Sequence, residues 1–310
     1  MTTPHIIFIP GTNPKPHAEE HRTLLWRTLL EGVRRVDAKA AQHLQAHPAQ
    51  FHLLSWNQLF YHEHKDISID LPWVEALLSK PKPIEQDILD ANAARLTINR
   101  GVLNALDHLP FLLQFLPKRA RKIVLDIDRY FNDTEQIASQ IRDLLKQVLH
   151  PLLKKNEPVL IIGHSMGSII AYDALWEMSQ ENIVGQQGIS GKVDFLTLGS
   201  PLGVRYVQRR LLGWQGAERT TYPANIRKWI NVAAESDLVA LNGNFSDRFK
   251  AMREHGLVES IEDYDHGVYN FFRNEEGLNS HRSYGYLINP VVGKVVADWW
   301  RESENKTVLA

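Results

Sequence analysis

One serine, flanked by glycines and placed between a strand-like and a helix-like segment, constrains the fold of this 310-residue chain more than any other feature. Val159–Ile162 is a short apolar run, and Gly163–Gly167 (Gly-His-Ser-Met-Gly) follows it directly. The next residues, rich in Ala, Ile and Leu, have the character of a helix. Residues two before and two after the serine must be small, because larger side chains would collide across so sharp a turn. The pattern predicts that the turn projects the Ser165 hydroxyl above the carboxyl end of a β-strand.

Strand-like and helix-like segments alternate along most of the chain. Apolar residues recur at helical spacing between positions 24 and 36, and residues 287–300 form a closing amphipathic helix. Such alternation is typical of a parallel sheet covered by helices, so we expect a mostly parallel, twisted sheet with helices on both faces. The predicted strands are His5–Ile9, Phe51–Trp56, Val159–Ile162, Val193–Leu198 and Ile226–Val232.

A long interval between the second and third predicted strands breaks this alternation. From about Phe60 to Lys122 the sequence carries five prolines with helical pieces between them. A long insertion without strands in a compact domain is usually functional. We therefore expect a helical cap, or lid, at about residues 60–122. A surface helical excursion without a function is the alternative.

The strand, the serine turn and the following helix resemble the α/β-hydrolase superfamily, on its serine esterase and lipase side. The segment His5–Thr12 (His-Ile-Ile-Phe-Ile-Pro-Gly-Thr) is similar to the strand and glycine-containing loop that supply an oxyanion donor in that superfamily, although Pro10 departs from the common His-Gly pair. Leu196–Gly203 and Asp126–Asn132 are similar to segments of bacterial lipase-like hydrolases. The resemblance implies a single α/β-hydrolase domain over residues 1–310, which starts at the superfamily's third strand and lacks its N-terminal hairpin.

The catalytic acid follows the serine in the superfamily's order of serine, acid and histidine. Asp237 lies in the loop after the last predicted strand, which is where the resemblance implies the acid. Glu235, Asp247 and Asp263 are its competitors.

Three histidines downstream could serve as the base that takes the serine proton. His281 lies in a loop that enters the final helix, where the resemblance implies this histidine. His266, in an acidic run that we interpret as a turn, is the second candidate. His255 follows what we interpret as a helix C-terminus, where a cationic histidine is favourable without any catalytic role.

Two backbone N–H groups are expected to stabilise an oxyanion. The Met166 N–H begins the helix after Ser165, where the helix dipole favours negative charge. The resemblance implies the Thr12 N–H as the second donor, with Gly11 giving the backbone room to approach. For His164, beside the nucleophile, we expect no chemical role.

These residues together imply a serine hydrolase that cleaves a carboxylic ester through an acyl-enzyme intermediate. Ser165 would be the nucleophile, His281 the base and Asp237 the group that orients it. Two alternatives stay open: an amidase or peptidase of the same fold, and a binding protein without catalytic activity. The sequence does not separate ester from amide cleavage, because one triad geometry serves both reactions.

Charge and cysteine content exclude other classes of protein. Lys and Arg number 35 against 36 for Asp and Glu, which argues against a nucleic-acid partner. The chain has no cysteine, which excludes disulfides, thiolate metal sites and a cysteine nucleophile. Among 14 histidines, His62 and His64 come nearest to a metal pair, and we interpret them as surface residues. We expect neither a cofactor nor a metal.

The N-terminus lacks a signal-peptide pattern, and no apolar run is long enough to span a bilayer. We therefore expect a cytoplasmic protein that acts on a small-molecule or lipid ester. The apolar run Leu109–Leu116 and the basic run Lys118–Lys122 would suit a lipid substrate or peripheral membrane contact through the cap. The alternative is that the apolar residues pack onto the sheet and the charges are solvated. The oligomeric state is left open.

Overall fold

The central sheet of the protein is parallel throughout. The computed structural model describes residues 2–81, 83–96, 118–133, 135–183, 191–216, 218–240 and 244–309, and in these residues six strands pair in the order β2-β1-β3-β4-β5-β6. The strands are β1 (His5–Ile9), β2 (Phe51–Leu53), β3 (Val159–His164), β4 (Val193–Leu198), β5 (Ile226–Val232) and β6 (Ser260–Tyr264). The pairing aligns Ile9 with Gly163 and His164 with Leu198, so the carboxyl ends of the central strands meet at one edge.

Alternate side chains of the strands enter two separate hydrophobic clusters, one on each face of the sheet. Ile6 and Phe8 of β1 belong to the first cluster, and Ile7 and Ile9 to the second. The first cluster is covered by α1 (Ala18–Arg34), α2 (Ala38–Gln45), α4 (Leu71–Ser79), α13 (Ser283–Leu287) and α14 (Pro290–Leu309). Over the second lie α3 (Asn57–Tyr61), α7 (Lys118–Asn132), α8 (Ile137–Lys154), α9 (Met166–Ile183), α10 (Arg205–Gln208), α11 (Phe245–Arg248) and α12 (Lys250–Glu254).

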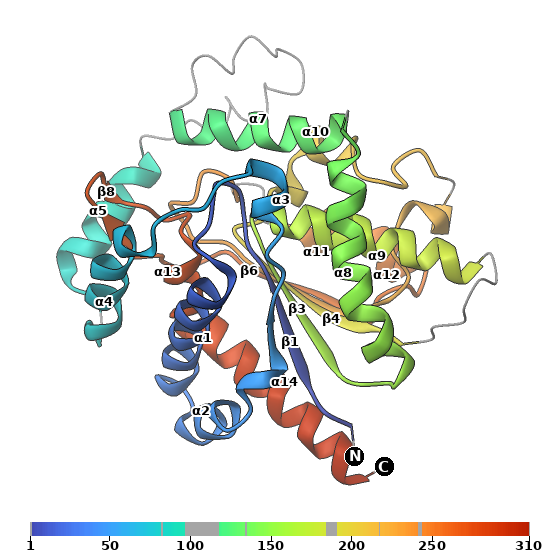
Figure 1. Ribbon diagram of the computed structural model, residues 1–310, viewed down its shortest axis with the longest axis horizontal. Coiled ribbons are helices and arrows are strands. Elements are labelled where there is room, and N and C mark those ends of the chain that lie inside the picture. The colour runs from blue at the N-terminus through green and yellow to red at the C-terminus, as the bar shows by residue number, and fades with distance from the viewer. Residues whose placement is uncertain are drawn as a thin grey trace.

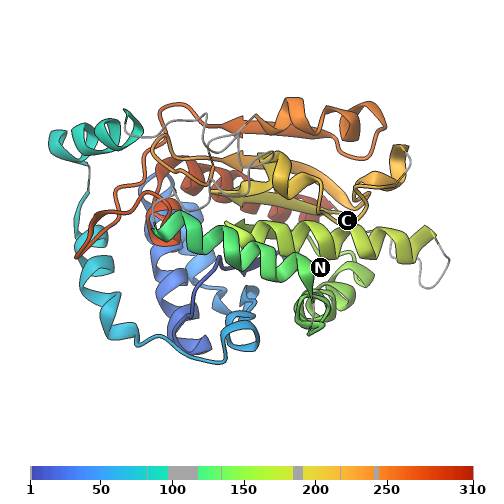
Figure 2. The same cartoon turned by 90° about the horizontal axis from the view of Figure 1, so that it is seen from above.

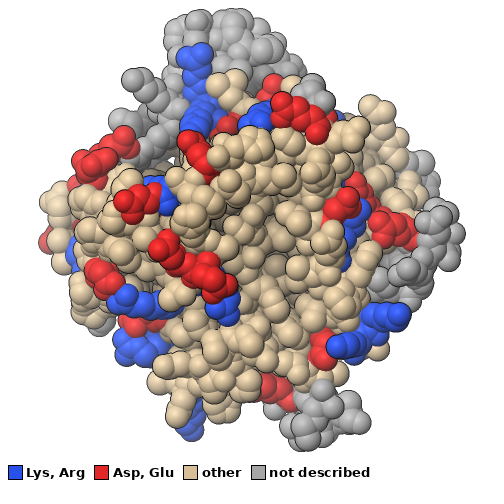
Figure 3. Space-filling model, in the orientation of Figure 1, with Lys and Arg blue, Asp and Glu red and all other residues tan. Residues whose placement is uncertain are grey.

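Figures 1 and 2 show α1 and α14 on one side of the strands and α8 and α9 on the other. The predicted mostly parallel sheet with helices on both faces is therefore confirmed. On the face shown in Figure 3, the described acidic and basic side chains are interspersed. Within the described part of the chain, no helix is both long and apolar enough to cross a membrane.

The interval expected to hold a cap contains α4, α5 (Glu85–Leu96) and the start of α7. α4 packs on α1, because Val74 and Leu77 join the first cluster and Arg35 Nη2 donates to the Leu78 carbonyl (3.1 Å). α7 lies at the same end of the sheet as α3 and α10 (Figure 1), and Tyr61 Oη donates to its Asp126 (2.8 Å). The apolar run Leu109–Leu116 lies outside the described residues.

The observed elements depart from the predicted ones in several places. β2 ends at Leu53 rather than at Trp56, because the chain turns there to enter α3. β6 was not expected: it is a largely polar edge strand in which only Ile261 is buried. The closing helix is two helices, α13 and α14, since Pro290 starts a new helix and the Asn289 side chain accepts a hydrogen bond from Val291 N (2.9 Å).

Candidate active site

Ser165 occupies the turn between β3 and α9 in a strained backbone conformation. Its φ is +52°, in the left-handed region that non-glycine residues rarely adopt. A Cβ added at Gly163 would lie 2.7 Å from Ser168 Cα, and one at Gly167 would lie 2.2 Å from the Ile9 carbonyl oxygen. The two glycines are therefore required for the close packing that holds this conformation, as the spacing of the sequence predicts.

The structure brings His281 and Asp237 to this serine from two distant loops. His281 Nε2 lies 2.8 Å from Ser165 Oγ, and His281 Nδ1 lies 2.8 Å from Asp237 Oδ2. Because Nδ1 faces the carboxylate, it carries the proton and leaves Nε2 free to accept the serine proton. Ser165 and Asp237 are buried, and the His281 side chain is 19% exposed. The arrangement can therefore pass a proton from the hydroxyl to the imidazole.

Asp237 has partners beyond the histidine. Its Oδ1 accepts a hydrogen bond from Val239 N (2.9 Å), and its Oδ2 accepts one from Tyr286 Oη (2.6 Å). At Gly199, whose φ is +56°, an added Cβ would lie 2.7 Å from Asp237 Oδ2, so the missing side chain makes room for the carboxylate. These contacts hold the acid in one orientation.

Sequence reasoning did not single out Tyr286. The signal was available, because a tyrosine in an apolar helix just after the predicted base needs a hydrogen-bond partner when buried. Burial, and after it the Asp237 charge, raise the pKa of Tyr286 well above its usual value, so the phenol stays protonated and donates. It also accepts a hydrogen bond from Ala234 N (2.9 Å).

His164 contacts the backbone of the predicted base. Its Nε2 lies 2.8 Å from the His281 carbonyl oxygen, and the centroids of the two rings are 5.0 Å apart. Burial, and then the charges of His281 and Lys15, lower the pKa of His164 well below its usual value. The neutral ring therefore donates from Nε2 and holds the His281 backbone, a supporting contact without chemistry.

The loop after β1 approaches Ser165 closely. A Cβ at Gly11 would lie 2.8 Å from Ser165 Cβ and 2.9 Å from His164 Nδ1, so only glycine fits there. Side chains at the start of α3 hold this loop: Trp56 Nε1 donates to the Pro10 carbonyl (2.8 Å) and Asn57 Nδ2 to the Gly11 carbonyl (2.9 Å).

The two expected oxyanion donors belong to the loop after β1 and to the start of α9. Thr12 is buried in the loop after β1, directly after Gly11. Met166 is buried at the first position of α9, where an N–H has no partner within the helix. Their role as an oxyanion hole stays a prediction.

The competing acids hold other parts of the structure. Glu235 Oε1 accepts a hydrogen bond from Gly267 N (2.7 Å), and Asp263 Oδ2 accepts one from Ser246 N (2.8 Å). Asp247 Oδ2 accepts a hydrogen bond from Nδ2 of Asn244 (2.8 Å), the residue that caps the N-terminus of α11. None of these three carboxylates hydrogen-bonds to His281 in the described residues.

The competing histidines lie elsewhere as well. His255 directly follows α12 and caps its C-terminus, as its sequence context predicts. The side chain of His266 is 90% exposed and lies near Asp265. In the described ranges, no group of three or more His, Asp or Glu side chains could hold a metal ion.

The comparisons with known proteins agree with this architecture. A family model described as "Alpha/beta hydrolase of unknown function" (DUF900) matches residues 108–210, which is one third of the chain and includes β3, the Ser165 turn and β4. No curated protein and no solved structure matches the chain. The parallel sheet and this match over one third of the chain together support the expected α/β-hydrolase fold.

Proposed function

We propose that this protein is a serine hydrolase that cleaves carboxylic esters through an acyl-enzyme intermediate on Ser165. The observation that carries the proposal is the hydrogen-bonded series from Ser165 Oγ to His281 Nε2 (2.8 Å) and from His281 Nδ1 to Asp237 Oδ2 (2.8 Å). It ends on a buried carboxylate and begins on a serine whose φ is +52°. Nucleophile, base and orienting acid thus have the mutual geometry that acyl transfer requires.

The reaction follows from these positions. Ser165 Oγ attacks the ester carbonyl while His281 Nε2 takes the hydroxyl proton, and Asp237 stabilises the imidazolium that forms. The N–H groups of Met166 and Thr12 would bind the oxyanion, each contributing on the order of 3 kcal/mol to transition-state stabilisation. His281 returns the proton to the leaving alcohol. Water, activated by the same histidine, then releases the acid and regenerates Ser165.

The proposal includes the organisation of the chain around this reaction. Residues as distant as Thr12 and His281 serve one site, so we take the chain to be one catalytic domain, with the helical segment at about residues 60–122 as its cap. We take the substrate to be a small-molecule or lipid ester, and the location to be the cytoplasm on the cysteine-free composition.

Labelling with a fluorophosphonate tests the nucleophile. We expect the wild-type protein to gain one adduct, mapped by mass spectrometry to the peptide that contains Ser165, and the Ser165→Ala variant to gain none. On p-nitrophenyl esters of rising chain length, Ser165→Ala should lower kcat by roughly 10⁴ or more, because the covalent route is lost.

Ser139→Ala removes a matched hydroxyl on α8, whose Oγ donates only to the Gln136 carbonyl (2.8 Å), and is the control. We expect it to keep both labelling and turnover. Full ester hydrolysis by purified Ser165→Ala, with an unchanged circular dichroism spectrum, would exclude the proposed nucleophile.

A further inference from the structure

A cluster of basic side chains that the proposed mechanism does not use borders the candidate site. Lys15 Nζ donates to the Thr12 carbonyl (2.6 Å), and Lys65 N donates to the Lys15 carbonyl (3.0 Å). Lys65 Nζ lies 2.7 Å from Asp70 Oδ1. Arg282 pairs with the other oxygen of Asp70. We call Lys15, Lys65 and Arg282 the cationic cluster.

These contacts lead from the expected oxyanion loop to the expected base. The path begins at Thr12, passes through the cationic cluster and Asp70, and ends at Arg282, which follows His281 in the chain. Three segments that are far apart in sequence therefore bring positive charge to the edge of one site. The residues come from the loop after β1, the segment before α4 and the start of α13.

The cationic cluster contains more positive groups than the carboxylates paired with them. Asp70, 4% exposed, is the carboxylate that pairs with both Lys65 and Arg282. Among the described residues no carboxylate lies within ion-pair distance of Lys15, and Arg282 Nε is buried without a hydrogen-bond partner. The three cations are partly buried, and charges withdrawn from water in proteins are normally paired, so a bound anion would balance this surplus.

The surrounding groups do not supply this charge. On α7, Lys122 and Asp126 are the next charges around Lys15, and they are of opposite sign. Burial, and then the charge of Arg282, lower the pKa of Lys15 well below its usual value. Burial, and then the charge of Lys15, also lower the pKa of His21 on α1 well below its usual value. A bound anion would relieve this repulsion.

We propose that the cationic cluster binds an anionic group of the substrate, a carboxylate or a phosphate, while the ester carbonyl lies at Ser165. An arginine fork and two ammonium groups are the donors that proteins use for such oxyanions. The inference rests on the proposed function and narrows its substrate class to esters with an acidic group near the scissile bond, rather than neutral lipid esters. The positive charge beside the site fixes the orientation of that substrate.

A pair of substrates of equal length tests this preference. p-Nitrophenyl hexanoate is neutral, and the mono-p-nitrophenyl ester of adipic acid places a carboxylate at the far end of the same six-carbon chain. At low ionic strength we expect kcat/KM of the wild-type enzyme to be about tenfold higher or more for the half-ester, the scale of one charged hydrogen bond.

Removing one cation should abolish the preference for the half-ester. Lys65→Met leaves Asp70 paired with Arg282, and we expect it to lower the ratio of half-ester to neutral kcat/KM about tenfold. Lys294→Met removes a lysine on α14 whose side chain is 72% exposed. It is the matched control, for which we expect an unchanged ratio.

Inorganic phosphate should inhibit hexanoate cleavage competitively, and it should inhibit the Lys65→Met variant less strongly. Phosphate inhibition without half-ester preference would assign the site to phosphate alone.

Two results would overturn the anion site: neither half-ester preference nor phosphate inhibition in the wild-type enzyme, or equal losses on both substrates in Lys65→Met. The chemistry at Ser165 is tested separately. If the fluorophosphonate does not label Ser165 but calorimetry shows phosphate binding that Lys65→Met weakens, the proposed function fails and the anion site stands.

Discussion

At the scale of single residues, the acid of the candidate triad depends on a phenol that lies five positions after the base. Tyr286 Oη donates to Asp237 Oδ2 (2.6 Å) and accepts from Ala234 N (2.9 Å), so it ties the carboxylate to the backbone after β5. Its helix, α13, begins two residues after His281. One short segment therefore carries both the proposed base and a group that positions the proposed acid.

Tyr286→Phe tests this positioning role. The change leaves Asp237 with one hydrogen-bond donor fewer, so its negative charge attracts a protonated His281 ring more strongly. We expect kcat/KM for esters to fall about tenfold, the scale of one lost hydrogen bond to a charged group. The acidic limb of the pH–rate profile should move to higher pH.

A purely structural role for Tyr286 would lower stability without moving the pH profile. Tyr172→Phe is the control, since it removes the hydroxyl of another buried tyrosine, whose ring packs near Trp229 and Phe249. The control should leave the pH–rate profile of the wild-type enzyme unchanged.

A second buried carboxyl, Asp173 of α9, makes the stability of the fold depend on pH. Its oxygens accept hydrogen bonds from Leu212 N (3.0 Å) and Tyr130 Oη (3.2 Å). Burial nevertheless raises its pKa to about 7. An aspartate in the unfolded chain has a pKa of about 4, so between these two values the native state binds a proton that the unfolded state has lost. The free energy of unfolding therefore falls as pH rises from about 4 to about 7.

Asp173→Asn should remove this dependence. From pH 5 to pH 8 the free energy of unfolding of the wild-type protein should fall by on the order of 2 kcal/mol more than that of the variant. Urea denaturation of both proteins at the two pH values measures this difference in free energy of unfolding. Both proteins have the same histidines, so the contribution of histidine titration cancels. A difference that is the same at both pH values would show that Asp173 does not titrate in this range.

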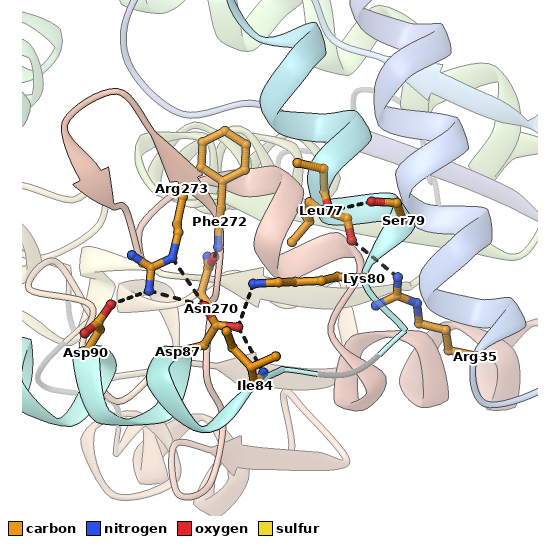
Figure 4. Close-up of polar contacts among 11 residues, drawn as sticks. Arg35, Leu77, Ser79, Lys80, Ile84, Asp87, Asp90, Asn270, Phe272 and Arg273 are labelled. Atoms are coloured by element: carbon orange, nitrogen blue, oxygen red, sulfur yellow. Dashed lines mark hydrogen bonds and ion pairs between the residues drawn. The ribbon is translucent and has the colours of Figure 1, made fainter.

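At the scale of elements, α5 is fastened to the segment that precedes the base. Figure 4 shows Asp87 between Lys80 and Arg273, with Asp87 Oδ2 at 2.8 Å from Lys80 Nζ and Asp87 Oδ1 at 3.2 Å from Arg273 Nη2. Arg273 also pairs with Asp90. Arg273 begins β7 (Arg273–Asn274), which pairs with β8 (Gly277–Leu278) just before His281. Part of the proposed cap is therefore tied to the loop of the base.

Asp87→Asn should loosen α5. The substitution keeps the size of the side chain but removes the carboxylate, 1% exposed, that Lys80 and Arg273 share, while Arg273 retains Asp90. We expect faster hydrogen exchange of the amides of α5 and no change in α8. Asp90→Asn removes a partner that is 33% exposed and should have a smaller effect. Equal exchange in both variants and the wild-type protein would contradict this fastening.

The elements also show what a sequence pattern can predict. β1, β3 and β4 are buried on both faces. The apolar runs of β1 and β3 are sufficient to predict these strands, and β4 remains mostly apolar despite Asp194 and Thr197. β6 lies at an edge and buries only Ile261, so its sequence carries no comparable signal. Ser165 could be predicted from residues within two positions of it, because the constraint on a sharp turn is local.

Asp237 and His281 required a family resemblance, since a loop acid and a loop histidine have no local pattern of their own. The contacts of Tyr286 and of the cationic cluster could not be predicted from spacing. They depend on which loops the sheet brings together, and the sequence positions of Lys15, Asp70 and Arg282 do not indicate that these residues meet.

At the scale of the whole molecule, the strand that is made first lies inside the sheet and pairs with a partner that is made much later. β1 lies between β2 and β3, and His5 is aligned with Val159. At a synthesis rate of about 5–20 residues per second, roughly 8 to 30 seconds separate the two strands on the ribosome. During that time Ile-Ile-Phe-Ile of β1 is an apolar segment without its central neighbour. We therefore expect the nascent chain to be a client of chaperones, and the yield of folded protein to depend on them.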